Sequence, residues 1–339
     1  MKIIQRVPLR LWLAAAAGLF LLMSLFTSDR VQAAPELHWY KGNLHTHTVN
    51  SDGDSTPNDV ASWYKEHRYN FLVLTDHNFR TEIDGLNSLH AAKDRFLLIP
   101  GEEVTDSFAK APVHINAYDG SSLVEPTHGQ SMVATIQRNV DAIRRVNGLP
   151  SVNHPNFGWA ITSKDLLEIQ NLNLFEVYNG HPYVNNSGGG GVESMDELWD
   201  TLLSAGRRIN GIAVDDAHHF KQLGRDRSNP GRGWVVVKAP ELTRSAIREA
   251  LISGKFYASN GVELTDVRSS ESELSVEIKP AGAAKHRTYF IGEQGKILGT
   301  SVDDVAVYKI RGNEKYVRAR VESSTGDMAW TQPVYPGAR

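Results

Sequence analysis

Apolar and polar residues follow an alternating pattern of strands and helices over residues 38–258. Continuous apolar runs at 71–75 and 96–99 are typical of buried parallel strands. Similar runs predict further strands at 113–118, 150–153, 174–178, 211–214 and 234–237. Amphipathic stretches between them predict helices at 57–68, 131–147, 163–170, 193–206 and 243–253. This alternation predicts an α/β fold built on a parallel sheet or barrel.

The pattern changes near Phe256. Residues 274–278 and 316–321 alternate apolar and polar positions, which is the period of half-buried antiparallel strands. We therefore expect a main α/β domain over 34–258 and a small C-terminal all-β appendage over 262–339.

The first 33 residues have the pattern of a secretory signal peptide. Lys2, Arg6 and Arg10 precede an almost wholly apolar segment at 11–26, and small residues at 31–33 offer a cleavage site. A helix of this length rises only about 24 Å, which is short of a hydrocarbon core of about 30 Å. We expect export to the periplasm or the medium, with retention as a membrane anchor as the alternative if the segment is not cleaved.

Charge and cysteine content restrict the partners. The chain has 36 basic residues, 39 acidic residues and no cysteine. Removal of residues 1–33 takes away four basic residues and one acidic residue, which leaves 32 and 38 and a net charge of −6. Such a balance argues against nucleic acid as a high-affinity partner and favours a small-molecule substrate. Without thiolates, any metal must be held by nitrogen and oxygen ligands.

Histidines and carboxylates gather at the ends of the predicted strands. His45 and His47 follow the first strand and, being two residues apart, point to the same side. The other candidates lie at or just beyond a strand terminus: Asp52, His77, Glu102 or Glu103, His114, His154, Asp215 or Asp216, and His218. Because the carboxyl edge of a parallel sheet is where sites are built, we expect these residues to form one metal site.

Taken in order, these motifs resemble the polymerase and histidinol phosphatase (PHP) family. The resemblance covers about residues 38–258 and depends on the runs His45-Thr46-His47 with Ser51-Asp52-Gly53, Thr75-Asp76-His77, Gly101-Glu102-Glu103, Asn153-His154-Pro155 and Asp216-Ala217-His218. It implies a distorted (β/α)7 barrel with two or three divalent metal ions, Zn, Mn or Fe, at its mouth. Export with a β-rich tail also resembles the branch that contains a carbaryl hydrolase, a carbamate and ester hydrolase.

The resemblance also implies a role for each ligand. The first metal would be held by His45, His47, Glu103 and Asp216, the second by Glu103 as a bridge with His114 and His154, and the third by Asp52, His77 and His218. The choice of Glu103 over Glu102 follows the family's Gly-x-Glu spacing, and the family pattern likewise selects Asp216 over Asp215. Asp76 is expected to orient a ligand. Catalysis would depend on Glu103, Asp216 and His218.

Two further groups are candidate substrate contacts. Arg225, Arg227 and Arg232 follow the last metal motif, where an arginine would form paired hydrogen bonds to a substrate phosphate. The alternative is a solvated loop with internal pairing to Asp226. His181 follows the strand that carries Glu176, and it would line the pocket or act in catalysis by protonating a leaving group.

The ligand set predicts a metal-dependent hydrolase. Metal ions lower the pKa of bound water to about 7, and the resulting hydroxide would attack a small phosphomonoester or nucleotide. This phosphoesterase, with a 5′–3′ exonuclease-like activity as one form of it, is the first hypothesis. A carboxyl or carbamate ester hydrolase that uses the same hydroxide is the second, and a non-catalytic metal-binding module is the third.

Overall fold

The computed structural model describes residues 35–337, and the expected signal peptide at 1–33 lies outside the described residues. The chain from Leu37 onward forms one compact unit. Its helices are α2 (Pro57–Glu66), α3 (Asp84–His90), α4 (Met132–Arg145), α5 (Ser163–Glu168), α6 (Met195–Ser204), α7 (Arg244–Ser253) and the short 3-10 helix η1 (Glu293–Gly295). Within residues 35–337, no helix is both long enough and apolar enough to cross a membrane.

The strands up to Ser259 carry the candidate site, and those after it make the C-terminal region. The first group comprises β1 (His38–Asn43), β2 (Phe71–Val73), β3 (Leu97–Ile99), β4 (Gly101–Phe108), β5 (Ala111–Tyr118), β6 (Leu149–Val152), β7 (Leu174–Asn179), β8 (Asn210–Val214), β9 (Trp234–Ala239) and β10 (Phe256–Ser259). The second comprises β11 (Leu264–Ser269), β12 (Glu273–Ile278), β13 (His286–Gly292), β14 (Lys296–Ser301), β15 (Val305–Lys309), β16 (Arg318–Ser323) and β17 (Met328–Thr331).

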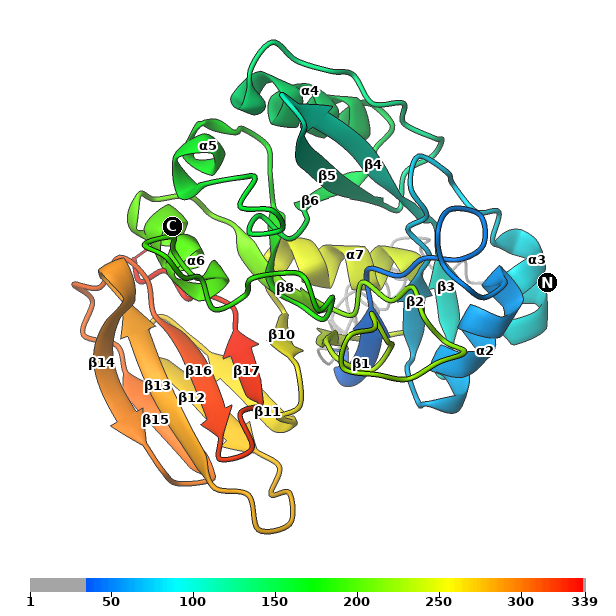
Figure 1. Cartoon of the computed structure of the whole chain (residues 1–339). Coiled ribbons are helices and arrows are strands. Elements are labelled where there is room, and N and C mark those ends of the chain that lie inside the picture. The colour runs from blue at the N-terminus through cyan, green and yellow to red at the C-terminus, as the bar shows by residue number, and fades with distance from the viewer. Residues whose placement is uncertain (1–34, 338–339) are drawn as a thin grey trace, which may run out of the picture. The chain divides into compact units, whose positions relative to one another are not determined.

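These strands form three sheets (Figure 1). One has nine strands in the order β14-β13-β16-β17-β10-β9-β1-β2-β3, one has five in the order β4-β5-β6-β7-β8, and one has three in the order β11-β12-β15. Parallel pairs such as β1–β2 and β7–β8 occur beside antiparallel pairs such as β1–β9 and β4–β5. The predicted α/β class is confirmed. The closed (β/α)7 barrel is not confirmed, because the strands of the described chain divide between separate sheets.

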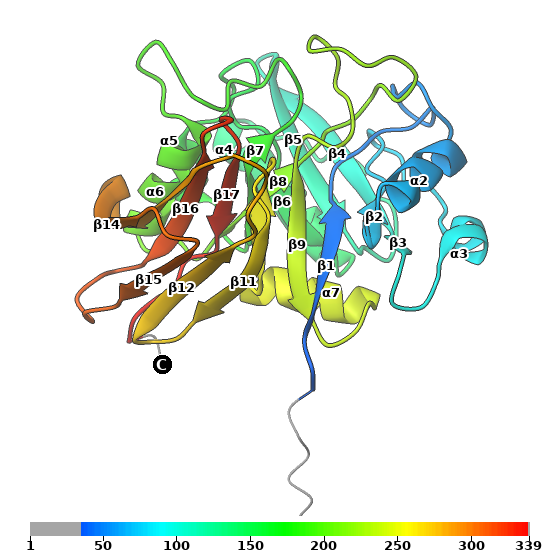
Figure 2. The same cartoon turned by 90° about the horizontal axis from the view of Figure 1, so that it is seen from below.

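Two single parallel bridges connect the nine-stranded sheet to the five-stranded sheet. Thr46, just beyond β1, pairs with Ala217, just beyond β8, and His77, beyond β2, pairs with Glu103 near the start of β4. In Figure 2 the loops that follow β1, β7 and β8 gather at the end of the strands opposite α7. The bridges therefore bring together the segments that carry the candidate ligands.

Local signals explain where the helices begin. The Thr56 side chain accepts the Asp59 N–H, and Pro57 occupies the first turn of α2, where no intrahelical donor is lost. At α6, Ser194 and Glu197 exchange side-chain to backbone hydrogen bonds in a capping box. These caps fix the starts of two helices close to where the sequence places them.

The hairpin of β4 and β5 corrects two predictions. Pro100 ends β3 as expected, but the chain enters β4 directly, so Glu103 lies near the beginning of a strand rather than at the end of one. His114 lies inside β5, opposite Thr105, rather than opening the strand. The strands are joined by Ala109 and Lys110, which both have positive φ, at 49° and 72°. A two-residue turn of this kind usually contains Asn or Gly, and because neither is present, no hairpin could be predicted here.

Four of the seven C-terminal strands continue the nine-stranded sheet, and β11, β12 and β15 form a sheet of their own. β17 pairs antiparallel with β10, and Tyr316 and Trp330 pack in one core cluster with Phe175 and Trp199. Apart from η1, residues 264–331 contain only strands and connecting turns. The region is β-rich as predicted, but a separate all-β appendage is not confirmed, because four of its strands share a sheet with the α/β part and Tyr316 and Trp330 share its core. The boundary expected near 258–262 stays a prediction.

Candidate metal centre

The nine predicted ligands meet in one cluster at the bridged ends of the two sheets. Five of them are buried, namely His45, His47, Glu103, His154 and Asp216. His77, His114 and His218 are partly exposed, and Asp52 reaches the cluster from the loop between β1 and α2. The structure therefore brings together every residue that the sequence selected as a metal ligand.

Glu103 is the centre of this cluster. Its Oε1 lies 3.1 Å from His114 Nδ1 and 3.5 Å from His154 Nε2. Its Oε2 lies 2.9 Å from His77 Nδ1 and 3.4 Å from His45 Nε2. A fully buried carboxylate with imidazoles at both oxygens has the arrangement needed to bridge two cations.

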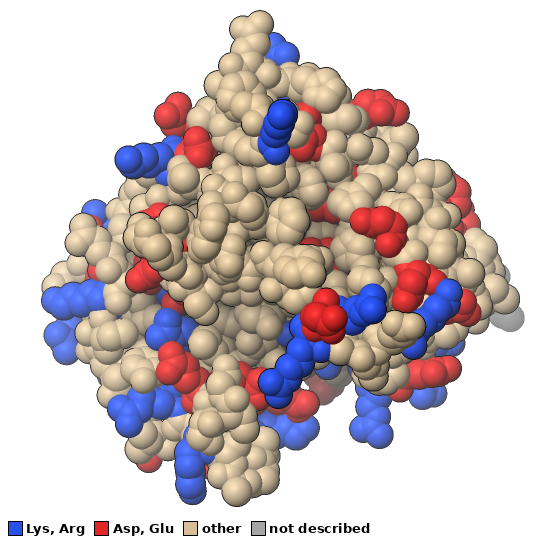
Figure 3. All heavy atoms as spheres, viewed as in Figure 1, with Lys and Arg blue, Asp and Glu red and all other residues tan. Residues whose placement is uncertain are grey.

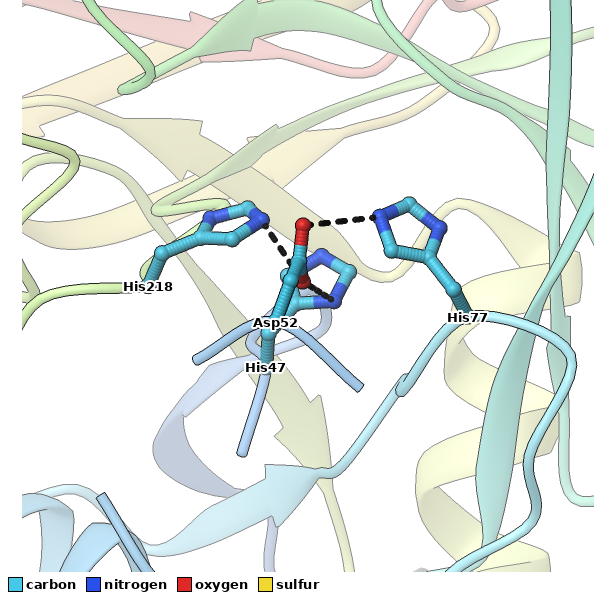
Figure 4. Close-up of side chains that lie close together, drawn as sticks. All are labelled: His47, Asp52, His77 and His218. Atoms are coloured by element: carbon cyan, nitrogen blue, oxygen red, sulfur yellow. Dashed lines mark ion pairs between the residues drawn. The ribbon is translucent and has the colours of Figure 1, made fainter. Parts of the chain in front are cut away.

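Asp52 closes the exposed side of the cluster (Figure 4). Its Oδ1 lies 3.3 Å from His218 Nε2 and 3.6 Å from His47 Nδ1, and its Oδ2 lies 3.6 Å from His77 Nε2. The Asp52 side chain is 56% exposed, whereas that of His47 is fully buried. The part of the cluster around Asp52 is thus the part most open to solvent.

Three sets of side chains are close enough to share an ion. They are His47, Asp52, His77 and His218; His45, His47 and Asp216; and His77, Glu103 and His114. His47 and His77 each belong to two sets. The three sets therefore overlap, whereas the family resemblance implies that each of these histidines serves one metal. The division itself stays a prediction.

The donor set fits divalent cations of the zinc, manganese or iron type. It offers imidazole nitrogens and carboxylate oxygens, and the chain contains no cysteine. Glu103 Oε2 and His114 Nδ1 are buried and lack a hydrogen-bond partner of acceptable geometry. Because an unpartnered buried polar atom is costly, these two atoms are suited to a bound cation.

The electrostatics of the cluster favour positive charge. Burial raises the pKa of Glu103, but the imidazoles around it, first His45, hold that pKa well below its usual range. Burial disfavours protonated His77, yet nearby carboxylates, first Glu103, raise its pKa to about 10. Burial and the neighbouring His218 lower the pKa of His47 to about 4. The carboxylates therefore stay ionised at neutral pH and attract protons or metal ions.

Three side chains that the sequence reasoning did not single out hold the candidate ligands in place. Glu176 Oε1 lies 2.7 Å from His45 Nδ1, and both residues are fully buried. Asn153 Nδ2 donates to Glu103 Oε1 at 2.7 Å, and Asn179 Nδ2 donates to Asp216 Oδ2 at 3.1 Å. The only sign of these supporting residues in the sequence is Glu176, an acid inside the otherwise apolar strand β7, because a buried acid requires a partner.

We expect Glu176→Gln to weaken metal binding by about 10–100-fold. The Glu176 carboxylate accepts a hydrogen bond from His45 Nδ1. The other ring nitrogen of His45, Nε2, is therefore free to face Glu103 and Asp216. Its other oxygen accepts the His154 N–H at 2.7 Å, and a glutamine amide cannot accept at both positions. Competition against a chromophoric chelator measures the change. The exposed Glu168→Gln is the control, and an affinity within threefold of the parent chain would contradict the positioning role.

Asp76 and local backbone strain complete the support. Asp76 accepts the Thr48 N–H at 2.7 Å and the Ser51 hydroxyl at 3.0 Å, so it fixes the loop between His47 and Asp52, as the orienting role predicted for it requires. His154 and Asp216 have positive φ, at 24° and 50°. Such backbone is strained for residues with a Cβ, and it is typical of sites whose geometry the surrounding structure imposes.

The adjacent acids point away from the cluster. Glu102 Oε1 accepts the Val124 N–H at 2.8 Å. Asp215 accepts the Tyr64 hydroxyl at 2.7 Å and the Gly233 N–H at 2.8 Å. These contacts agree with the choice of Glu103 and Asp216. At Glu102 and Glu103, inside β4, the opposite directions follow from the alternation of side chains along a strand.

His181 lies beside the cluster. Its ring centroid is 5.6 Å from that of His218, and its Nδ1 accepts the Tyr183 N–H at 3.2 Å. Neutral His181 therefore carries its proton on Nε2. A donor at this place is compatible with the predicted contact to a leaving group.

The three arginines are placed differently from one another. The Arg232 guanidinium donates to the carbonyls of Gly180 and Gly224 and to Asn229 Oδ1, so it ties the loop that follows β8 to the loop that follows β7. Arg225 is exposed and Arg227 is half-buried in the same loop. Figure 3 shows basic and acidic side chains interspersed around this face rather than one basic surface. Their predicted contacts with substrate phosphate stay predictions.

The sequence matches no protein-family model and no curated protein. Among solved structures, a two-domain protein from Bacteroides vulgatus that contains a predicted PHP-like metal-dependent phosphoesterase is 17% identical. Its TM-score is 0.52, over 84% of this chain and 90% of that chain. A candidate metal-dependent phosphoesterase from Bifidobacterium adolescentis is 14% identical, with a TM-score of 0.42 over 58% of this chain and 91% of that one. The first likeness confirms the PHP resemblance at the level of the fold: the described chain has the fold of a PHP-like protein.

Proposed function

We propose that this chain is an exported metal-dependent phosphoesterase that acts on a small phosphomonoester or nucleotide. One observation carries the proposal: nine metal-competent side chains from separate segments of the chain meet in one cluster, with the fully buried Glu103 at its centre. The fold of a PHP-like protein supports it, as does the signal-peptide pattern at 1–33 for export.

Two or three divalent ions would be held by the ligands of the cluster, namely His45, His47, Asp52, His77, Glu103, His114, His154, Asp216 and His218. When bound, such ions supply a nucleophile from water at neutral pH and neutralise charge on the phosphate. Asn153 and Glu176 keep Glu103 and His45 in fixed orientations for this task. His181 offers its Nε2 proton to the leaving-group oxygen.

A carboxyl or carbamate ester hydrolase is the second candidate, and Arg232 favours it. The Arg232 guanidinium already donates to Gly180 O and Asn229 Oδ1, so it is committed to loop contacts instead of a substrate phosphate. A carbonyl substrate needs no such cation, since the metal ions polarise it directly.

The two candidates are separated by a substrate panel on metal-loaded protein. We expect the purified chain to contain at least two equivalents of zinc, manganese or iron by elemental analysis. We expect it to hydrolyse nitrophenyl phosphate, with bis(nitrophenyl) phosphate and naphthyl acetate as comparison substrates. Hydrolysis of the carboxylic ester alone would reject the phosphoesterase proposal in favour of the second candidate.

A further inference from the structure

An aromatic wall, formed by Phe157, His181 and Tyr183, runs along the metal cluster. The Phe157 ring centroid lies 5.2 Å from that of His154 and 5.9 Å from that of His181. His181 lies 5.6 Å from His218 and 5.4 Å from Tyr183. The wall thus connects a candidate ligand on the β6 loop to one on the β8 loop, and Tyr183 extends it toward solvent with 68% of its surface exposed.

Hydrogen bonds between two loops hold this wall in place. Phe157 forms an antiparallel bridge with Val184. Asn156 Nδ2 donates to Asn185 O and Asn185 Nδ2 donates to Asn156 O, each at 3.1 Å. Because the loops after β6 and β7 are locked to each other, the rings are already placed before any ligand arrives. Such preorganisation lowers the entropic cost of binding.

Other ligand-bearing loops also expose apolar side chains. Val49 and Phe79 each lie two residues beyond a candidate ligand, and Trp159 lies five residues beyond His154. Trp159 is 42% exposed and has a φ of 56°, a left-handed backbone that a bulky aromatic residue rarely adopts. Single exposed apolar residues are ordinary, so these three side chains only agree with an apolar ligand group beside the cluster, and the aromatic wall itself carries the inference.

We propose that the aromatic wall binds a planar aromatic group in the leaving part of the substrate, attached to the ester oxygen directly or through one carbon. The inference rests on the proposed function. The ring would pack on Phe157 and Tyr183, while His181 Nε2 donates a hydrogen bond to the ester oxygen. In the hydrolysis, water adds its oxygen to phosphorus, the bond from phosphorus to the ester oxygen breaks, and that oxygen leaves as the protonated alcohol or phenol.

The test compares benzyl phosphate with cyclohexylmethyl phosphate on the metal-loaded full chain. The two leaving alcohols have similar reactivity and size, but only the first has a flat ring. We expect Tyr183→Leu and Phe157→Leu to lower kcat/KM for benzyl phosphate about threefold to tenfold more than for cyclohexylmethyl phosphate. Each variant keeps an apolar side chain, so the ratio reports the ring. Leu89→Ala, an exposed site on α3, is the control and should leave the ratio as in the parent chain.

The outcomes distinguish this inference from the proposed function. If both phosphates are hydrolysed and the variants lower both equally, the inference is wrong while the function stands. If only the corresponding acetate esters are hydrolysed, the function is wrong, and the same ratio measured on the acetates decides the inference. Calorimetry with benzylphosphonate and cyclohexylmethylphosphonate gives a readout without turnover. Tighter binding of benzylphosphonate that Tyr183→Leu removes would support the wall, and equal affinities would overturn it.

Discussion

Glu103→Ala is expected to remove at least one metal ion and to lower hydrolytic activity by at least about 100-fold. Both Glu103 oxygens face imidazoles, at 2.9 Å for His77 and 3.1 Å for His114. No other carboxylate in the described chain approaches both of these rings. Alanine would leave the surrounding imidazoles without the anion that attracts cations to them. Elemental analysis after gel filtration measures the metal, and the substrate panel measures the activity.

Glu102→Gln is the matched control for this variant. Glu102 is adjacent, equally buried and bonded to the Val124 N–H on the opposite side of the strand. Burial raises the pKa of Glu102 to about 7, so a neutral glutamine changes little there. Glu103→Gln, which preserves shape but removes the charge, separates loss of the ligand from loss of the fold when its far-ultraviolet circular dichroism matches that of the parent chain. A Glu103→Ala protein with its full metal content and half its activity would refute the bridging role.

The position of the candidate site could be predicted because the direction of side chains near a strand end depends mainly on neighbouring residues. His45 and His47 project to one side because they are two residues apart, just beyond β1. Asp216 and His218 have the same spacing just beyond β8, but the positive φ of Asp216, 50°, means that the strand rule does not account for their direction. Parallel pairing of β1 with β2, of β6 with β7 and of β7 with β8 then carries the ends of these strands to the same edge of their sheets. These steps need only short-range regularity, so a single sequence was sufficient for them.

The support of the site could not be predicted, because it depends on contacts between distant parts of the chain. Glu176 and His45 are separated by 131 positions, and Asn153 and Glu103 by 50. Nothing in the local pattern identifies such partners. The same limit applies to Arg232, for which the sequence suggested substrate phosphate or internal pairing with Asp226, whereas the fold offers carbonyl groups of two neighbouring loops.

The fold departed from expectation where the backbone makes an unusual turn. Ala109 and Lys110 turn β4 back into β5 without the glycine or asparagine that normally marks a tight hairpin. The sequence pattern predicted no strand between 99 and 113, yet β4 lies there and pairs antiparallel with β5, where a parallel sheet or barrel was expected. Four of the C-terminal strands likewise extend the nine-stranded sheet through the pairing of β10 with β17, which alternation of side chains alone does not specify.

Arg318→Ala is expected to destabilise the protein by about 3–5 kcal/mol. Arg318 is fully buried and forms a bidentate pair with Asp200, at 2.8 Å and 2.6 Å, while its third nitrogen lies 3.1 Å from Asp196. Tyr316 donates to the same Asp200 carboxylate at 2.8 Å. Alanine would leave Asp200, a buried residue of α6, without its cation. Urea unfolding of chelator-treated protein measures the loss independently of metal binding.

A double substitution separates the lost cation from the lost packing. Arg318→Met combined with Asp200→Leu removes both charges and keeps side-chain volume, and it should recover most of the stability lost in Arg318→Met alone, since a buried ion pair is often replaceable by apolar residues. Arg268→Ala is the surface control, because its partner Asp266 lies 2.7 Å away but the arginine side chain is 71% exposed. That variant should leave the free energy of unfolding close to that of the parent chain, because solvent screens an exposed ion pair. If the free energy of unfolding of Arg318→Ala differed from that of the parent chain by less than about 1 kcal/mol, the Arg318–Asp200 pair would not be the contact that holds β16 against α6.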